Sequence, residues 1–176
     1  RAQAIFESLL QRNKASIRVT DLSRKEEIKA LLGASDSHLS PAGLVKEQGH
    51  FASHDLFSEG LITIQDESSQ LVAPTLELQG DEQVLDACAA PGGKTAHMAS
   101  YLTTGQVTAL DLYDHKLTLI QENAQRLGVA DRVQTQKLDA RKVHEFFGKD
   151  QFDKILVDAP CSGIGLLRRK PDIKYN

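Results

Sequence analysis

The sequence of 176 residues is long enough for one domain of ordinary size, or for a small domain joined to part of a larger one. Apolar residues make up 40% of it and charged residues 26%, and the formal net charge of −3 argues against a general nucleic-acid binder. No apolar run approaches the roughly 18 residues of a membrane span, and the first residues lack the layout of a signal peptide. The two distant cysteines indicate neither a disulfide framework nor a zinc site. We therefore expect a cytoplasmic protein with no membrane partner and no metal.

The first part of the chain predicts short, mixed elements. Residues 1–11 have the pattern of a helix, and Ser23 and Glu26 have the spacing of a capping box that would open a second helix, with Gly33 at its end. The strands expected here cover residues 16–20, 43–45 and 61–64. These elements predict a small α+β module.

The pattern changes near residue 80. From Asp81 onward, apolar strands that end in acidic or Gly/Pro-rich turns alternate with helical segments, which is typical of βαβ units. The expected strands cover residues 84–88, 107–111, 132–135 and 152–157. The expected helices cover residues 94–102 and 115–127, with Asp114 as the cap of the second helix and Gly128 just past its end.

The predicted fold class is therefore α/β. Residues 76–176 are expected to form the N-terminal part of a Rossmann-like sheet, and residues 1–75 the small α+β module that precedes it. Four strands are fewer than an open doubly wound sheet usually has, so we expect the sheet to be incomplete at the C-terminus of this sequence.

A Gly-rich turn covers residues 86–95, where the first parallel strand turns into the first helix. Small residues let the backbone approach a ligand closely, and a helix N-terminus presents N–H groups to an anion. The end of this turn, Gly93-Lys94-Thr95, is similar to that of a phosphate-binding P-loop, but such a loop needs a glycine where Cys88 stands. The turn predicts an anionic ligand and makes a nucleoside triphosphate the weaker alternative.

Two aspartates follow the next strands at the same edge of the predicted sheet. Asp111 has the position at which nucleotide-binding βαβ units bind both ribose hydroxyls, although a lone aspartate would more often cap a loop. Asp139 has a suitable position to accept a hydrogen bond from an adenine amino group, and a turn-capping role before Ala140 fits its spacing nearly as well. NAD and S-adenosylmethionine both fit these features.

The segment from Asp158 to Gly163 follows the fourth strand. Methylation of a pyrimidine at carbon 5 needs a thiolate that adds at carbon 6 and a group that binds the polar edge of the base. Cys161 and Asp158 are residues of the types that this chemistry needs, whereas a free cysteine is more often a small buried hydrophobe. Arg168, Arg169 and Lys170 form a basic cluster that fits either a contact with a polyanion or a solvated surface.

The motifs at residues 86–95, 158–162 and 168–173 together resemble those of the Sun/Fmu-type RNA cytosine-5 methyltransferases, in particular the bacterial members that act on 16S ribosomal RNA. Residues 60–70 resemble the lead-in to the methyltransferase domain of that family. The resemblance implies S-adenosylmethionine as the cofactor and RNA as the partner. It also implies that residues 1–75 form an RNA-binding module.

The resemblance further implies a role for each candidate residue. Residues expected at the methionine end of the cofactor are Cys88, Ala89, Ala90, Pro91, Gly92, Gly93 and Lys94. Asp111 would bind the ribose and Asp139 the adenine. Asp158 would lie between the cofactor and the target cytosine.

For the covalent chemistry, the resemblance implies that Cys161 assists product release. In this family the attacking thiolate belongs to a Thr-Cys motif, and this sequence contains no Thr-Cys dipeptide. Arg168, Arg169 and Lys170 would contact RNA. We expect this chain to bind the cofactor and to lack the main nucleophile; the alternative is a catalytically silent module that binds RNA and cofactor.

Overall fold

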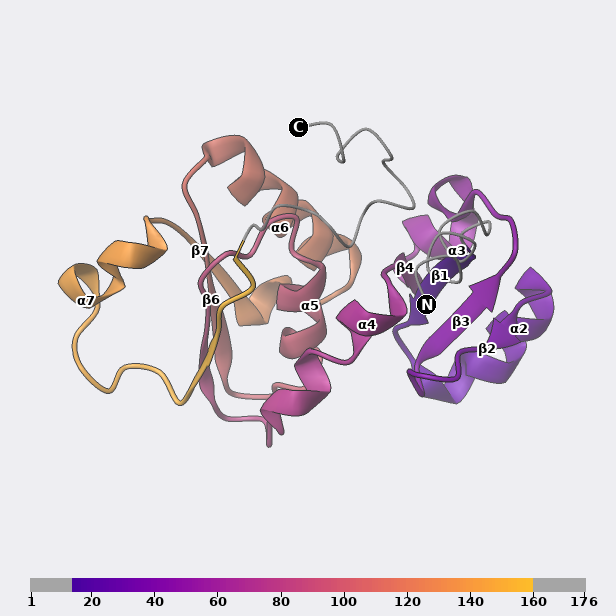
Figure 1. Ribbon diagram of the computed structural model, residues 1–176, viewed down its shortest axis with the longest axis horizontal. Coiled ribbons are helices and arrows are strands. Elements are labelled where there is room, and N and C mark those ends of the chain that lie inside the picture. Colours follow the sequence, from indigo (N-terminus) through magenta and orange to yellow (C-terminus); the bar gives the residue numbers. More distant parts are fainter. Residues whose placement is uncertain (1–13, 160–176) are drawn as a thin grey trace, which may run out of the picture.

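The computed structural model of the protein describes residues 14–159, which form two four-stranded sheets (Figure 1). The helix expected over residues 1–11 lies outside the described residues, as do Cys161 and the basic cluster at residues 168–170. Within residues 14–159, no helix is long and apolar enough to cross a membrane. The same residues contain no group of His, Cys, Asp and Glu side chains that would hold a metal ion.

The N-terminal sheet is antiparallel, with the strand order β2-β3-β1-β4. Its strands are β1 (Ala15–Val19), β2 (Ser35–Asp36), β3 (Gly43–Lys46) and β4 (Ile62–Ile64). Its helical elements are η1 (Leu22–Arg24), α2 (Lys25–Leu32), η2 (Phe51–Ser53) and α3 (Asp55–Ser58). Ile17, Ile28 and Leu44 are fully buried in the hydrophobic core of this part. The small α+β arrangement and its three expected strands are confirmed.

The expected capping box is wrong. Asp21 is the cap, because its carboxylate accepts hydrogen bonds from the backbone N–H of Ser23 at 2.9 Å and from its hydroxyl at 2.6 Å. The 3₁₀ turn η1 thus precedes α2, and α2 begins without a side-chain cap. Gly33 ends α2 in the left-handed conformation with φ 56°, as expected.

The second sheet is parallel, with the strand order β7-β6-β5-β8. Its strands are β5 (Gln83–Asp86), β6 (Gln106–Asp111), β7 (Val133–Lys137) and β8 (Lys154–Leu156). Helical elements of this part are α5 (Gly93–Ala99), α6 (Asp114–Arg126), η4 (Ala130–Arg132), η5 (Ala140–Lys142) and α7 (Val143–Phe146). The chain runs from β5 outward to β6 and β7 and then returns to the other side of β5 as β8. This reversal is a topological switch point of a Rossmann-like sheet, so the predicted fold class is confirmed.

The helices α5 and α6 pack on the face of the parallel sheet that is turned toward the N-terminal sheet, and α7 lies on the other side (Figure 1). Ile120 and Ala124 of α6 are buried, as its apolar periodicity predicts. Asp114 does not cap α6: it is the first helical residue, and its carboxylate instead pairs with Lys137 of β7 at 2.5 Å. The helix therefore starts one residue earlier than expected.

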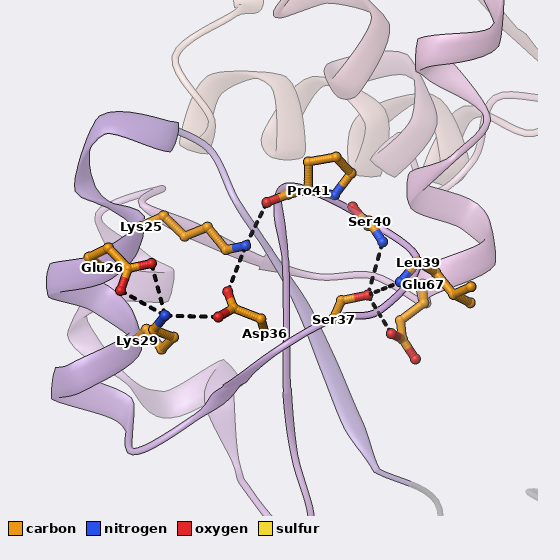
Figure 2. Close-up of polar contacts among 9 residues, drawn as sticks. All are labelled: Lys25, Glu26, Lys29, Asp36, Ser37, Leu39, Ser40, Pro41 and Glu67. Carbon is orange, nitrogen blue, oxygen red and sulfur yellow. Dashed lines mark hydrogen bonds and ion pairs between the residues drawn. The ribbon is translucent and has the colours of Figure 1, made fainter.

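The segment between the two sheets contains α4 (Glu67–Gln70) and η3 (Ala73–Leu76) and is tied back to the N-terminal sheet. The Ser37 hydroxyl donates a hydrogen bond to Glu67 of α4 at 2.5 Å and accepts two from the backbone N–H groups of Leu39 and Ser40 (Figure 2). The side-chain amide of Gln70 donates to Ser16 of β1 at 3.2 Å. Hydrogen bonds of several side chains thus hold the segment between the two sheets against the N-terminal sheet.

Arg126 of α6 joins the two sheets directly. Its Nη1 donates to the carbonyl oxygens of Phe57 at 2.8 Å and Ile62 at 3.2 Å, and its guanidinium lies 3.8 Å from the centre of the Phe57 ring. Gly60 fits against the same helix end with φ 75°, and a Cβ atom there would lie 2.0 Å from the carbonyl oxygen of Arg126. These contacts fix the two sheets relative to each other.

Candidate functional site

The Gly-rich turn after β5 is packed closely against α6. Gly92 has φ 97°, and a Cβ atom on it would lie 2.9 Å from the Cα of Ile120, so only glycine fits here without strain. The side-chain amide of Asn123 donates to the carbonyl oxygen of Pro91 at 2.7 Å, and the Ala90–Pro91 peptide bond is cis. The backbone of the turn is therefore positioned by α6 at the carboxyl edge of the sheet.

Asp86 lies beneath this turn and is almost fully buried. Burial raises the pKa of its carboxyl group to about 6, against the opposing effect of a hydrogen bond that the Thr95 hydroxyl donates at 2.7 Å. Asp86 thus stabilises the turn through its hydrogen bond with Thr95, whereas ionisation of its buried carboxyl group at neutral pH is unfavourable.

A cavity of about 1240 Å³ opens along the carboxyl ends of the four parallel strands; we name it the large cavity. It gathers residues from the end of each parallel strand, together with Asp66, Ser68 and Ser69 from the segment after β4. Seven candidate residues line it: Cys88, Ala90, Pro91, Lys94, Asp111, Asp139 and Asp158. This is the edge at which sheets with a topological switch point bind their ligands.

Asp111 ends β6 at the middle of this edge, with 11% of its side chain exposed. Its Oδ1 accepts a hydrogen bond from the backbone N–H of Tyr113 at 3.2 Å and lies 3.8 Å from Nζ of Lys116. The carboxylate is held in place from one side and lines the cavity, so it is placed to accept hydrogen bonds from a ligand.

Asp139 serves as a turn cap, one of the two roles that its spacing allows. Its carboxylate accepts from the backbone N–H of Arg141 at 3.0 Å and from the Arg141 guanidinium at 2.6 Å, and these bonds lower its pKa to about 2. The Arg141 side chain is 87% exposed. A ligand that needs the oxygen of Asp139 would have to compete with a guanidinium that is free to move into solvent.

A second, smaller cavity of about 220 Å³ adjoins the first and lies between the parallel sheet and the segment that follows β4; we name it the small cavity. Lys94 and Asp158 line both cavities and form an ion pair with each other. The residues contributed from the β4 side include Gln65, Asp66 and Ser69. Sequence reasoning did not assign these three to the site, although the polar run that begins directly after a strand was a signal that could have identified them.

Comparisons with known proteins are consistent with this geometry. The family 16S rRNA methyltransferase RsmB/F matches residues 73–176. The chain belongs to this family. The resemblance seen in the motifs is thereby confirmed.

Two curated relatives of this RsmB/F chain carry the name ribosomal RNA small subunit methyltransferase B. The "probable" enzyme of Bacillus subtilis is 55% identical over 129 residues, which cover 73% of this chain and 29% of that protein. The Vibrio cholerae protein is 37% identical over 173 residues, covering 98% of this chain and 36% of that protein. This chain thus spans about a third of the length of these relatives.

Among solved structures, a methyltransferase homologue from Pyrococcus horikoshii is 30% identical with a TM-score of 0.81, over 99% of this chain and 60% of that chain. NSun6 from the same organism, solved with SFG, has a TM-score of 0.81 at 22% identity, over 92% of this chain and 67% of that chain. The second likeness shows the shared fold alone.

Cys88 is the only cysteine within the described part of this RsmB/F chain. Burial raises the pKa of its thiol, and the carboxylates of Asp86 and Asp111 raise it further. A raised pKa disfavours the thiolate that a nucleophile needs. The environment of Cys88 therefore supports its assignment to the cofactor turn.

Proposed function

We propose that this chain provides the S-adenosylmethionine site of an enzyme that methylates carbon 5 of a cytosine in RNA, with 16S ribosomal RNA as the substrate. The observation that carries the proposal is the large cavity of an RsmB/F family member, which collects Cys88, Lys94, Asp111, Asp139 and Asp158 at the switch point of the sheet. SFG, the analogue of S-adenosylmethionine present with NSun6, supports the choice of cofactor.

In this proposal the cofactor lies along the carboxyl edge of the sheet. Asp139 accepts from the adenine amino group once Arg141 has moved away, and Asp111 accepts from the ribose hydroxyls. The turn from Cys88 to Lys94, which includes Ala89, Ala90, Pro91, Gly92 and Gly93, lines the methionine end. An unphosphorylated ribose is favoured because Asp111 would repel a phosphate.

The target cytosine is placed beyond the cofactor, where Asp158 follows β8. S-adenosylmethionine supplies an electrophilic methyl group when bound. A thiolate would add at carbon 6 of the base, and carbon 5 would then take the methyl group from the sulfonium, which leaves as the neutral thioether. The proton on carbon 5 would pass to water, and the carbon–sulfur bond to the enzyme would break to return the thiolate. Asp158 binds the polar edge of the base, and Cys161 assists release of the product.

RNA is proposed to contact Arg168, Arg169 and Lys170 together with the module of residues 1–75. Within the N-terminal sheet, Arg24, Lys25 and Lys29 are already paired with acidic side chains. The RNA contact is therefore assigned to other residues than these three.

Calorimetric titration of the chain with S-adenosylmethionine, NAD and ATP tests the cofactor assignment. We expect heat of binding with S-adenosylmethionine alone. Binding of NAD or ATP in its place would overturn the proposal, because the Gly-rich turn and Asp111 would then serve a dehydrogenase or a P-loop protein.

The role of Cys161 is tested by Cys161→Ala in a longer polypeptide that also carries a Thr-Cys motif. If Cys161 assists release, the variant should transfer the methyl group to 16S ribosomal RNA and then accumulate a covalent protein–RNA adduct that survives denaturing electrophoresis. Absence of any adduct, together with loss of methyl transfer, would instead make Cys161 the nucleophile.

A further inference from the structure

The most unusual side chain of the N-terminal sheet is Arg18, the fourth of the five residues of β1. Its neighbours Ile17 and Val19 are in the hydrophobic core, so Arg18 points to the opposite face, where it lies across from Thr63 of β4. Arg18 is only 3% exposed, and burial lowers its pKa to about 10. A guanidinium is costly to bury, and its hydrogen bonds are therefore informative about its role.

Arg18 fixes the orientation of one amide. Its Nε donates to Oε1 of Gln65 at 2.8 Å, and Gln65 itself is 8% exposed. Because the oxygen of this amide accepts from Arg18, its Nε2 group points away from Arg18, on the side of Gly93, and both Gln65 and Gly93 line the small cavity. Within residues 14–159, Nε2 makes one long hydrogen bond, of 3.4 Å to the carbonyl oxygen of Ser69. An amide N–H with donating capacity thus lines the cavity.

The Gln65 amide lies beside the Gly-rich turn. A Cβ atom on Gly93 would stand 4.0 Å from Nε2, with no nearer neighbour, so the first residue of α5 leaves the approach to the amide open. The side chains that can donate into the small cavity include Gln65, Ser69 and Lys94. The acceptors include the carboxylates of Asp66, Asp86 and Asp158. A small cavity with donors and carboxylates suits a group that carries both a carboxylate and an ammonium.

The small cavity continues the large one, with which it shares Cys88, Lys94 and Asp158. A ligand that places its nucleoside at Asp111 and Asp139 in the large cavity reaches the small cavity with its other end. An α-amino acid is zwitterionic, as this lining requires.

We propose that Gln65 binds the α-amino-acid end of the cofactor through Nε2, and that Arg18 is the positioning residue that orients its amide. The inference rests on the proposed S-adenosylmethionine site and adds to it a residue held by the N-terminal sheet. By this assignment that sheet forms part of the cofactor site in addition to any contact with RNA.

Gln65→Glu separates this role from a structural one. The new carboxylate still accepts from Arg18, now as a charged pair, so the variant should unfold at the same temperature as the parent or higher. In the cavity it replaces an N–H donor by an acceptor, so the affinity for S-adenosylmethionine should fall at least about tenfold. The affinity for 5′-methylthioadenosine, which has the same nucleoside and no amino-acid end, should not change.

Gln134→Glu is the matched control, because Gln134 is exposed on β7 and the change adds the same charge. Gln134→Glu should change neither the affinity for S-adenosylmethionine nor that for 5′-methylthioadenosine. Arg18→Lys is a second variant that keeps a buried cation but shortens its reach, so that the Gln65 amide is no longer fixed. It should weaken S-adenosylmethionine binding by a smaller factor, again without effect on 5′-methylthioadenosine.

Three results would overturn the assignment. Unchanged affinity of Gln65→Glu for S-adenosylmethionine would remove Gln65 from the site. An equal loss for both ligands would show that Gln65 acts only through the shape of the turn. A parent chain that binds neither ligand would contradict the proposed cofactor site itself, and the inference would fall with it.

Discussion

Asp36 of the N-terminal sheet and Asp139, which lies shortly after β7, are both paired with basic side chains but differ in their surroundings. Lys25 and Lys29 lower the pKa of Asp36 to about 2, and Arg141 lowers that of Asp139 to about 2. Figure 2 shows Asp36 of β2 paired with Lys25 and Lys29 of α2, and its side chain is 51% exposed. Asp139 lines the large cavity, and its partner projects into solvent. An aspartate paired with basic side chains thus links α2 to β2 in one region and lines a ligand cavity in the other.

The two sheets are held together where Gly60 packs against the end of α6. Of the substitutions proposed, Gly60→Ala should disturb this junction most. The added Cβ would meet the carbonyl oxygen of Arg126 at 2.0 Å, on top of the strain of a positive φ. We expect a loss of about 2–5 kcal/mol in the free energy of unfolding, measured by urea denaturation.

Gly128→Ala is the control for this prediction. Gly128 also has a positive φ, of 69°, but nothing lies within 4 Å of its Cβ position. Its cost should be limited to about 1–2 kcal/mol of backbone strain. Equal costs for the two variants would mean that the junction of the sheets yields to the added atom.

The parallel sheet could be predicted from the sequence more fully than the N-terminal one. β5 and β6 have largely apolar centres and end in turns with recognisable chemistry, so Asp111 and the Gly-rich turn could be located in the sequence from the ends of these strands. In the N-terminal sheet, the two-residue strand Ser35–Asp36 and the 3₁₀ turn that precedes α2 are too short to leave an informative local pattern. Gln65 escaped assignment because its orientation depends on Arg18, 47 positions earlier in the chain.

A second prediction concerns Asp86, the buried acid under the turn. Its pKa in the folded protein is raised from 3.8 to about 6, so the folded state binds this proton more tightly than the unfolded state does. The contribution of Asp86 to stability is therefore lost as the pH rises from about 4 to about 6. The free energy of unfolding of Asp86→Asn, relative to that of the parent, should therefore rise by about 3 kcal/mol across that window.

The measurement for Asp86→Asn is the free energy of unfolding at pH 4 and pH 7, by urea denaturation. Asp81→Asn, at an exposed position before β5, is the control and should parallel the parent. A difference between Asp86→Asn and the parent that does not grow with pH would contradict the raised pKa.

A third prediction addresses the cavity edge. Asp111→Ala should weaken S-adenosylmethionine binding about tenfold or more, because hydrogen bonds from ribose hydroxyls to a carboxylate contribute about 1.5–3 kcal/mol each. Calorimetric titration measures the change. Asp114→Ala removes an exposed acid from the start of α6 and should leave the affinity as it is. If Asp111→Ala binds as tightly as the parent, the ribose does not lie at the end of β6.

The smallest effect is expected for Asp36→Asn, and its sign is opposite to that of Asp86→Asn. The pKa of Asp36 is lowered by hydrogen bonds from Lys25 and Lys29, so its contribution to stability is present above pH 4 and is lost as the pH falls toward 2. The variant should therefore be slightly less stable than the parent at pH 7, with the difference vanishing in acid and in 1 M NaCl, because the pair is exposed and salt screens it. Thermal unfolding at the two pH values and at two salt concentrations checks this.

The affinity of Asp36→Asn for S-adenosylmethionine should match that of the parent, since Asp36 and both lysines lie in the N-terminal part of the fold, away from the cavities. A loss of affinity with Asp36→Asn would show that the ion pairs of this sheet, and not only the Arg18–Gln65 contact, determine the geometry of the cofactor site.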